Sequence, residues 1–136
     1  MKALTHLLLL EDDAIEIMKF ERVIQKLGTS FTLSIAHDGA IALEKLQQAK
    51  EHLPELILLD LNMPNFNGIE FLRSVKKNPA WCHIPCVVLT TSDNRIDLMD
   101  CYREGIAGYF LKPLRYDDYV VLIQSILAYW NNSHLV

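Results

Sequence analysis

Two short runs of uninterrupted apolar residues set the tightest limit on how this chain can fold. Leu7–Leu10 and Leu56–Leu59 are each the length of one strand and contain no polar residue. A strand with one face in water alternates apolar and polar side chains, so a continuous apolar run indicates a strand buried on both faces. Such strands are typical of parallel sheets that carry helices on both faces.

The remaining sequence alternates further strand candidates with amphipathic segments. After the first strand, apolar residues recur at helical spacing until Gly28, which is a common helix stop. Five such β-α units predict an α/β fold, an open parallel sheet with right-handed crossovers and helices on both faces. The expected strands lie at about residues 5–11, 31–36, 55–60, 85–90 and 107–111. The first expected helix ends at Gly28. The other four cover about residues 39–52, 69–77, 94–104 and 116–130.

The last helix candidate is apolar on more than one side. The stripe expected to face the sheet consists of Tyr119, Leu122, Ile123, Ile126 and Trp130. Four further apolar residues lie off this stripe, namely Val120, Val121, Leu127 and Tyr129. A second apolar side on a surface helix is a candidate contact surface for a partner.

Composition restricts the class of protein. A chain of 136 residues, 51% of them hydrophobic, has the size of one domain with a proper core. A formal net charge of −4 without a large basic cluster argues against nucleic acid and anionic membrane as partners. The apolar runs are too short to span a membrane, and the start leads straight into a strand, so we expect a cytoplasmic protein. The three cysteines lack metal-ligand companions and are expected to be reduced and structural.

Acidic residues gather at the ends of two strand candidates. Glu11, Asp12 and Asp13 follow the first strand, and Asp60 ends the third. In an open parallel sheet these positions meet at the carboxyl edge, where like charges about 4 Å apart repel by roughly 1 to 4 kcal/mol. A cation is expected to neutralise them, and oxygen ligands in a water-accessible site suit Mg²⁺. Asp13 has the alternative role of capping the helix that follows it.

A hydroxyl and an amine end the two later strands. Thr90 closes the fourth strand candidate, and Lys112 follows the fifth, directly before Pro113. An aspartate beside Mg²⁺ can act as a nucleophile and form an aspartyl phosphate, and Asp60 is the best placed to do so. Phosphoryl transfer needs positive charge and hydrogen-bond donors around the phosphoryl oxygens, which Lys112 and Thr90 supply.

Four segments together resemble the receiver domain of bacterial two-component response regulators. They are Leu9–Asp13, Leu58–Pro64, Val88–Ser92 and Tyr109–Pro113, and they occur in the family's order along essentially the whole chain. The resemblance implies a flavodoxin-like three-layer sandwich with five helices and the strand order 2-1-3-4-5. It also implies that residues 1–136 form a single receiver domain without an output domain, because the last helix uses most of the residues after Lys112.

The resemblance assigns roles to the acids and their neighbours. Asp60 would accept a phosphoryl group from a phosphohistidine on a sensor histidine kinase. Asp12 and Asp60 would bind Mg²⁺ through their side chains, Asn62 through its backbone carbonyl and Glu11 through water.

The remaining site residues would contact the phosphoryl group or respond to it. Lys112 would pair with Asp60 or its phosphate, with a cis peptide before Pro113, and Thr90 would hydrogen-bond a phosphoryl oxygen. Tyr109 corresponds to the family's switch aromatic, which rotates inward when Thr90 moves and thereby changes a docking surface.

The chain departs from the common family pattern at several positions. Asn65 and Asn67 stand where Gly and Asp are frequent, so the loop backbone is expected to differ. Thr91 stands where Ala or Gly is usual. A β-branched residue there narrows the route for attacking water, which predicts a long-lived phosphorylated form.

Without an output domain the signal would leave by docking. The partner would be an effector protein, a histidine phosphotransfer protein in a relay, or a second copy of the chain. The connection at residues 77–85 resembles that of stand-alone regulators associated with phytochrome-type kinases, so the sensor kinase is expected to be of that type.

Other functions fit part of the pattern. A Mg²⁺ phosphatase of the haloacid dehalogenase kind also uses an aspartate after a strand, but it needs a second Asp two positions on, where this chain has Asn62. An adaptor that works unphosphorylated and a relay intermediate remain alternatives to the switch. In each non-phosphatase reading the chain is no metabolic enzyme and catalyses only its own phosphorylation and dephosphorylation.

Overall fold

The predicted five-stranded parallel sheet is present in the structure, a computed structural model that describes residues 4–28, 30–63 and 67–136. Its strands are β1 (His6–Leu10), β2 (Thr32–Ala36), β3 (Leu56–Leu59), β4 (Cys86–Thr90) and β5 (Gly108–Leu111). They pair in the order β2-β1-β3-β4-β5, and every neighbouring pair is parallel. The order that the resemblance implied is therefore confirmed.

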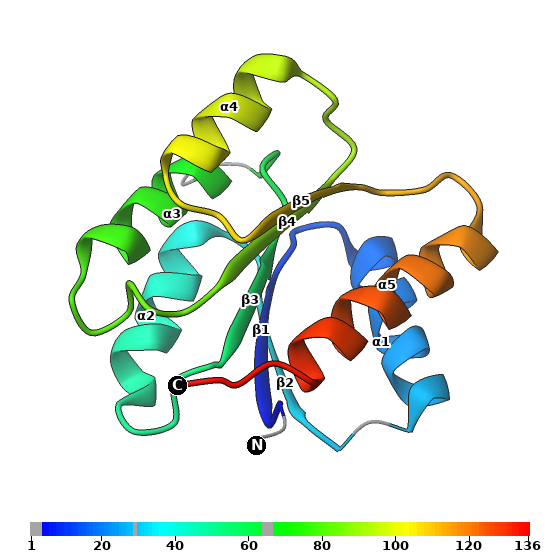
Figure 1. Ribbon diagram of the computed structural model, residues 1–136, viewed down its shortest axis with the longest axis horizontal. Coiled ribbons are helices and arrows are strands. Elements are labelled where there is room, and N and C mark those ends of the chain that lie inside the picture. The colour runs from blue at the N-terminus through cyan, green and yellow to red at the C-terminus, as the bar shows by residue number, and fades with distance from the viewer. Residues whose placement is uncertain (1–3, 29, 64–66) are drawn as a thin grey trace.

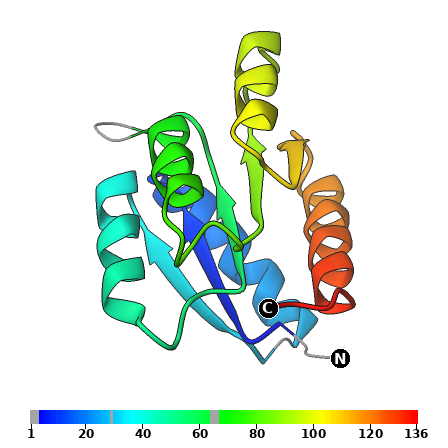
Figure 2. The ribbon, with the colours of Figure 1, turned by 60° about the vertical axis from the view of Figure 1, so that its left-hand side comes forward.

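Within the described residues, five helices cover the two faces of this sheet. They are α1 (Ala14–Leu27), α2 (Gly39–Ala49), α3 (Gly68–Lys77), α4 (Arg95–Arg103) and α5 (Tyr116–Asn131). Figure 1 shows α1 and α5 together on one side and α2, α3 and α4 on the other, and Figure 2 shows the three layers from a second direction. The flavodoxin-like sandwich is confirmed.

The apolar runs of the central strands bury their side chains in two separate layers. Leu8 and Leu10 of β1 pack with residues of α2 and α3, whereas Leu7 and Leu9 pack with residues of α1 and α5. All four leucines are at most 5% exposed. Because successive side chains of a strand point to opposite faces, an uninterrupted run fills both layers at once.

Local signals determine where the first and fourth helices begin and end. Asp13 accepts hydrogen bonds from the amides of Ile15 and Glu16 and so caps α1, as the alternative interpretation of this residue predicted. Gly28 ends α1 with a φ of 63°, a left-handed conformation that glycine adopts without strain. Gly105 follows α4 with a φ of 89°.

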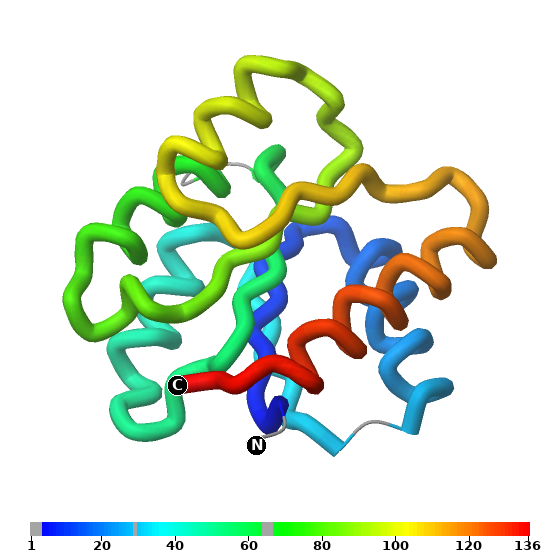
Figure 3. The backbone as a smooth tube through the Cα atoms, viewed as in Figure 1, coloured from blue at the N-terminus to red at the C-terminus, as the bar shows by residue number. Residues whose placement is uncertain are grey.

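The predicted stripe of α5 is partly wrong. Leu127, expected to lie off the stripe, is 5% exposed and packs in the same cluster as Leu4 and Leu135. Val121 and Tyr129 do lie outside the core, with 60% and 65% exposure. Figure 3 shows that the chain after α5 turns back across the end of the sheet.

The cysteines are free thiols, as expected. Cys82 is exposed, while Cys86 and Cys101 are buried in the layer under α2, α3 and α4. Burial raises the pKa of Cys86 to about 11 and that of Cys101 to about 12. Both therefore stay protonated at neutral pH and act as small core residues.

Candidate functional site

The carboxyl ends of four strands meet at one edge of the sheet, and the backbone there continues the sheet pattern by one residue. The amide of Asp60 donates to the carbonyl of Leu10 at 3.1 Å, and the amide of Lys112 donates to the carbonyl of Thr90 at 2.8 Å. The amide of Glu11 donates to the β2 carbonyl of Ala36 at 3.0 Å. These bonds place the predicted site residues side by side on the rigid sheet.

Lys112 forms the centre of a buried ion-pair cluster. Its Nζ lies 2.6 Å from Oε1 of Glu11 and 3.3 Å from Oδ2 of Asp60. The three side chains are only 6%, 5% and 12% exposed, respectively. Segments that are 49 or more positions apart in the sequence thus bring one amine and two carboxylates together in a region with little water.

This cluster shifts the protonation equilibria of its members. Burial raises the pKa of the Glu11 carboxyl, and the hydrogen bond and charge of Lys112 offset this only in part. Burial by itself would lower the pKa of Lys112, but the Glu11 hydrogen bond and the charges of Asp60 and Glu11 outweigh it, so this pKa is raised. One cation is shared by two carboxylates. With both carboxylates ionised the cluster has a net negative charge, which favours the binding of a further cation.

Thr90 and Tyr109 are connected to each other through the loop after β4. Thr90 is fully buried, and its Oγ1 accepts a hydrogen bond from the amide of Ser92 at 3.2 Å. The hydroxyl of Tyr109 donates to the backbone carbonyl of Ser92 at 2.7 Å. The ring of Tyr109 packs on the buried cluster under α2, α3 and α4, and burial raises the pKa of its hydroxyl. A shift of Thr90 would therefore reach Tyr109 through one residue.

The predicted metal ligands all lie near this edge of the sheet, but they differ in burial and in contacts. Glu11 and Asp60 share Lys112, while Asp12 is exposed at the edge beside them. Asn62 is exposed, and its amide donates to Oδ1 of Asp60 at 3.4 Å. Among the described residues no group of three or more histidine, cysteine or carboxylate side chains is arranged to hold a metal ion. The donor set itself is all oxygen, which suits a hard divalent ion such as Mg²⁺.

Gly68, the first residue of α3, lies against the backbone of Asp60 and Leu61. A Cβ at Gly68 would lie 2.5 Å from the carbonyl oxygen of Asp60 and 2.9 Å from Cα of Leu61. A larger residue is thus incompatible with this backbone path. Of the two asparagines that depart from the common family pattern, Asn65 lies outside the described residues, whereas Asn67 caps α3 by accepting a hydrogen bond from the amide of Glu70.

The prediction of a cis peptide bond before Pro113 is wrong. The described residues contain no cis peptide bond, and the Lys112–Pro113 bond is trans. Lys112 still reaches both carboxylates, because its amide hydrogen bond to Thr90 fixes the start of the side chain.

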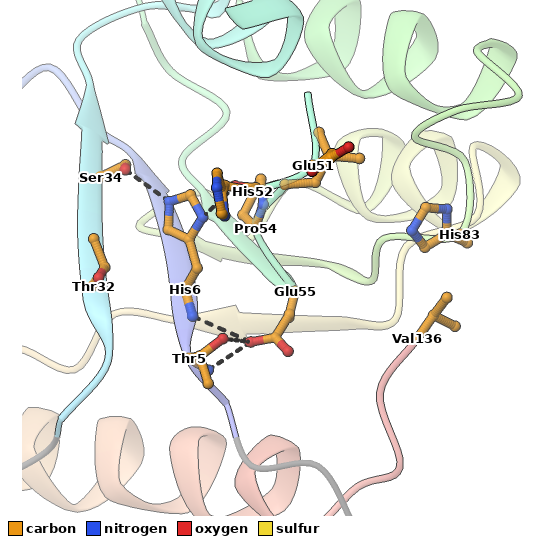
Figure 4. A pocket seen from close by; sticks show the side chains of 11 residues that line it. Thr5, His6, Thr32, Ser34, Glu51, His52, Pro54, Glu55, His83 and Val136 are labelled. Carbon is orange, nitrogen blue, oxygen red and sulfur yellow. Dashed lines mark hydrogen bonds between the residues drawn. The ribbon is translucent and has the colours of Figure 1, made fainter. Parts of the chain in front are cut away.

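A hollow of about 650 Å³ lies at the opposite, amino edge of the sheet. Figure 4 shows that its polar groups bind one another: the His6 ring contacts the Ser34 hydroxyl at 2.8 Å and the His52 carbonyl at 2.9 Å. Oε1 of Glu55 accepts hydrogen bonds from Thr5 and His6. These contacts tie the strand starts to the loop before β3, so we assign the hollow a structural role.

Comparison with known proteins agrees with this geometry. Residues 7–124 match the model of the response regulator receiver domain family. The chain belongs to the response regulator receiver family. Receiver domains are modules of two-component signalling, not a family of metabolic enzymes, and the haloacid dehalogenase alternative is not supported.

Several receiver proteins are similar over nearly their whole length. The response regulator Rcp1 of Synechocystis is 36% identical over 128 residues, which cover 91% of this chain and 87% of that protein. The probable methanogenesis regulatory protein FilR2 of Methanothrix harundinacea is 34% identical over 127 residues, covering 91% and 82%. The phosphorylated cyanobacterial phytochrome response regulator RcpA superposes with a TM-score of 0.90 at 29% identity, covering 98% of this chain and 99% of that one.

Structures in the same family have been determined with divalent ions. Rcp1 was solved in a Mn²⁺-bound form, which superposes with a TM-score of 0.88 at 34% identity and covers 97% of this chain and 99% of that chain. Within the described residues of the present chain, no helix is long and apolar enough to cross a membrane.

Sequence reasoning missed two polar residues near the site. They are Ser92 and Asp97, which lie beyond the strand ends from which the site was predicted. The signal that could have found them is local: a serine two residues after Thr90 is followed five residues later by an acid in the first turn of α4.

Proposed function

We propose that this receiver domain is a phosphorylation switch in which Asp60 accepts a phosphoryl group from a histidine kinase with the help of Mg²⁺. The observation that carries the proposal is the buried contact of Lys112 with both Asp60 and Glu11, at the same sheet edge where β4 ends in the buried Thr90. The phosphorylated state of the similar regulator RcpA supports it.

Each residue has a defined part in the transfer. A carboxylate oxygen of Asp60 attacks the phosphorus of a phosphohistidine, so that a P–O bond forms, the P–N bond breaks and the imidazole leaves with the bonding pair. Lys112 and the Thr90 hydroxyl are placed to stabilise the negative charge on the phosphoryl oxygens. Asp12, Asp60 and the Asn62 carbonyl would hold Mg²⁺, with Glu11 acting through water, and the ion would supply further positive charge to the same oxygens.

Water ends the phosphorylated state by attacking the same phosphorus. The aspartyl P–O bond then breaks, inorganic phosphate leaves and the carboxylate of Asp60 is regenerated. The domain therefore turns over only its own phosphoryl group.

The kinase would approach over the carboxyl edge. Ile15 and Met18 of α1 are 70% and 58% exposed, and Leu114 in the loop after Lys112 is completely exposed. These apolar residues follow the acids and the amine in sequence and fit an apolar helical surface of a kinase that presents its phosphohistidine to Asp60. We propose a phytochrome-type kinase, since RcpA is a phytochrome response regulator.

The output would leave through the surface of α4, β5 and α5. Ile96, Met99 and Tyr102 of α4, Leu111 of β5 and Val121 of α5 are all 43% or more exposed. Tyr109 and Ser92 connect this surface to Thr90. An effector, a phosphotransfer protein or a second copy of the chain would dock here. Sedimentation at several concentrations, with and without beryllofluoride, tests the second copy, and an unchanging monomer counts against it.

The decisive experiment compares the wild type with Asp60→Asn. Both are incubated with a ³²P-labelled phytochrome-type kinase and Mg²⁺, and the label on the receiver is measured. Label on the wild type and none on the variant supports the switch. Label on neither protein favours an adaptor that works unphosphorylated.

A further inference from the structure

We propose that Asp97, in the first turn of α4, is a positioning residue for the phosphoryl chemistry at Asp60. It acts through Ser92, whose amide holds the oxygen of Thr90. This inference rests on the proposed function and assigns a role to a side chain outside the carboxylate cluster.

The contacts that carry the proposal converge on Ser92. Its hydroxyl donates to Oδ2 of Asp97 at 2.8 Å, and its amide donates to Oγ1 of Thr90 at 3.2 Å. Its carbonyl accepts the hydroxyl proton of Tyr109 at 2.7 Å. The amide of Asn94 also donates to the Ser92 hydroxyl oxygen, at 3.4 Å. Ser92 is thus held from its side chain, and its backbone contacts both Thr90 and Tyr109.

The position of Ser92 determines the direction in which the Thr90 hydroxyl donates its proton. A threonine hydroxyl has one proton to donate and two lone pairs that accept. When the amide of Ser92 occupies a lone pair, the proton remains available for a phosphoryl oxygen at Asp60. Because Thr90 is fully buried, it has no water to replace this amide if Ser92 moves away.

Asp97 is suited to hold Ser92 because its hydrogen bond is charge-assisted. Hydrogen bonds from a hydroxyl to an ionised carboxylate are about twice as strong as neutral ones. The carboxylate is itself placed by the start of α4, where Asn94 accepts the amide protons of Ile96 and Asp97 and so caps the helix.

A purely structural role for Asp97 makes a different prediction. An acid in the first turn stabilises a helix through the helix dipole regardless of what its side chain contacts. Under that role Asp97→Asn would lose most of the effect, since the amide has no charge. Under the positioning role Asp97→Asn keeps an oxygen that can accept the Ser92 proton, whereas Asp97→Ala does not.

The test measures phosphoryl uptake from acetyl phosphate with Mg²⁺ and the subsequent loss of the phosphoryl group. We expect Asp97→Ala and Ser92→Ala to slow both steps by roughly three- to tenfold, the effect of one lost hydrogen bond. Asp97→Asn should stay within about twofold of the wild type, and the double alanine variant should be no slower than either single one. The matched control is Asp100→Ala, because Asp100 lies on the same helix and pairs with Arg103 at 3.6 Å.

A second measurement does not depend on phosphorylation. Amide hydrogen exchange of Ser92 reports its bond to Thr90, and it should become faster in Asp97→Ala while the amides of α1 and α5 are unchanged. The proposal is overturned if Asp97→Ala matches the wild type, if Asp97→Asn is as slow as Asp97→Ala, or if the two single effects add. Should the wild type take up no phosphoryl group, the proposed function fails, and the exchange of Ser92 still decides whether Asp97 positions Thr90.

Discussion

At the scale of single residues, Lys112 is the side chain on which the site depends most. It is the shared partner of two carboxylates that lie almost without solvent, and neither of them is paired with another side chain within the described residues. Removing one partner of a buried ion pair is costly because the remaining charge has neither water nor counter-ion. The amine therefore has a structural task as well as the proposed chemical one.

Replacing Lys112 with methionine should lower the free energy of unfolding by about 3 to 5 kcal/mol at pH 8. The deficit should shrink towards pH 4.5, the ordinary pKa of a glutamate. A carboxyl with a raised pKa in the folded state binds its proton more tightly there, so its destabilising effect is absent below the ordinary pKa and grows as pH rises. Without the amine, the pKa of Glu11 is raised further.

Urea unfolding of this variant at several pH values provides the measurement. The control is Lys77→Met, which removes an exposed amine from α3 and should change stability little at any pH. A Lys112→Met deficit of the same size at pH 5 and pH 8 would show that lost packing, and not uncompensated charge, causes it.

Thr91 is the residue that should set the lifetime of the phosphorylated form. It is exposed directly after Thr90, at the edge where water must reach Asp60. Thr91→Ala removes the branched side chain and should speed the loss of phosphate about fivefold, which corresponds to about 1 kcal/mol in the barrier. Label retention after removal of the donor measures this rate. Thr32→Ala, at the start of β2, is the control, and equal lifetimes for wild type and Thr91→Ala would refute the idea.

At the scale of elements, Gly68 packs the start of α3 against the backbone of Asp60 and Leu61. Its amide donates to the carbonyl of Leu61 at 3.3 Å, and a side chain would press on the Asp60 carbonyl. Gly68→Ala should therefore lower the free energy of unfolding by about 1 to 3 kcal/mol and displace Asp60. Phosphoryl uptake should slow as well.

Gly28→Ala is the informative comparison for this substitution. Gly28 has a φ of 63° but open space around its α-carbon, so alanine should cost about 1 to 2 kcal/mol of stability. Because Gly28 is at the amino edge of the sheet, phosphoryl uptake should be unchanged. Equal effects of the two variants on uptake would mean that the Gly68 contact does not position Asp60.

The elements differ in how much of them the sequence could predict. Strand positions, the end of the first helix at Gly28, the end of the fourth helix near residue 104 and the cap at Asp13 follow from local pattern and were confirmed. The burial of Leu127 could not be predicted from the periodicity of α5 alone, because the cluster in which it packs also contains residues outside that helix, among them Leu4 and Leu135.

The candidate site also has features that the sequence predicts and features that it does not. Strand ends predicted that Glu11, Asp60, Thr90 and Lys112 would share one edge. They could not predict that Lys112 would lie nearer to Glu11 than to Asp60, nor that Ser92 would connect Thr90 with Tyr109. Those details depend on side-chain torsions and loop paths, which a residue pattern does not specify.

At the scale of the whole molecule, the sheet has the candidate site at one edge and a set of mutually hydrogen-bonded polar groups at the other. Acids and the amine lie at the carboxyl edge, whereas the polar groups of the amino edge bind one another. The two core layers hold the sheet between these ends. Stability and reactivity are therefore coupled most directly through the charges at the carboxyl edge.

That coupling makes Mg²⁺ a test of the site through the stability of the entire domain. An ion that binds the folded state alone raises the free energy of unfolding by about 1.4 kcal/mol when its concentration is about ten times its Kd. We expect such a gain for the wild type in Mg²⁺ relative to EDTA. Asp12→Asn removes one proposed ligand and should lose most of the gain, while its stability in EDTA stays equal or rises because acid repulsion is relieved.

Thermal unfolding of both proteins over a range of Mg²⁺ concentrations measures this difference. Glu21→Gln is the control, since Glu21 is an exposed acid on α1 and should leave the gain intact. Equal gains for the wild type and Asp12→Asn would place any bound ion elsewhere and remove Asp12 from the proposed ligands. A gain that depends on Asp12 would instead connect the folding energy of the whole sandwich to the carboxylates that surround Asp60.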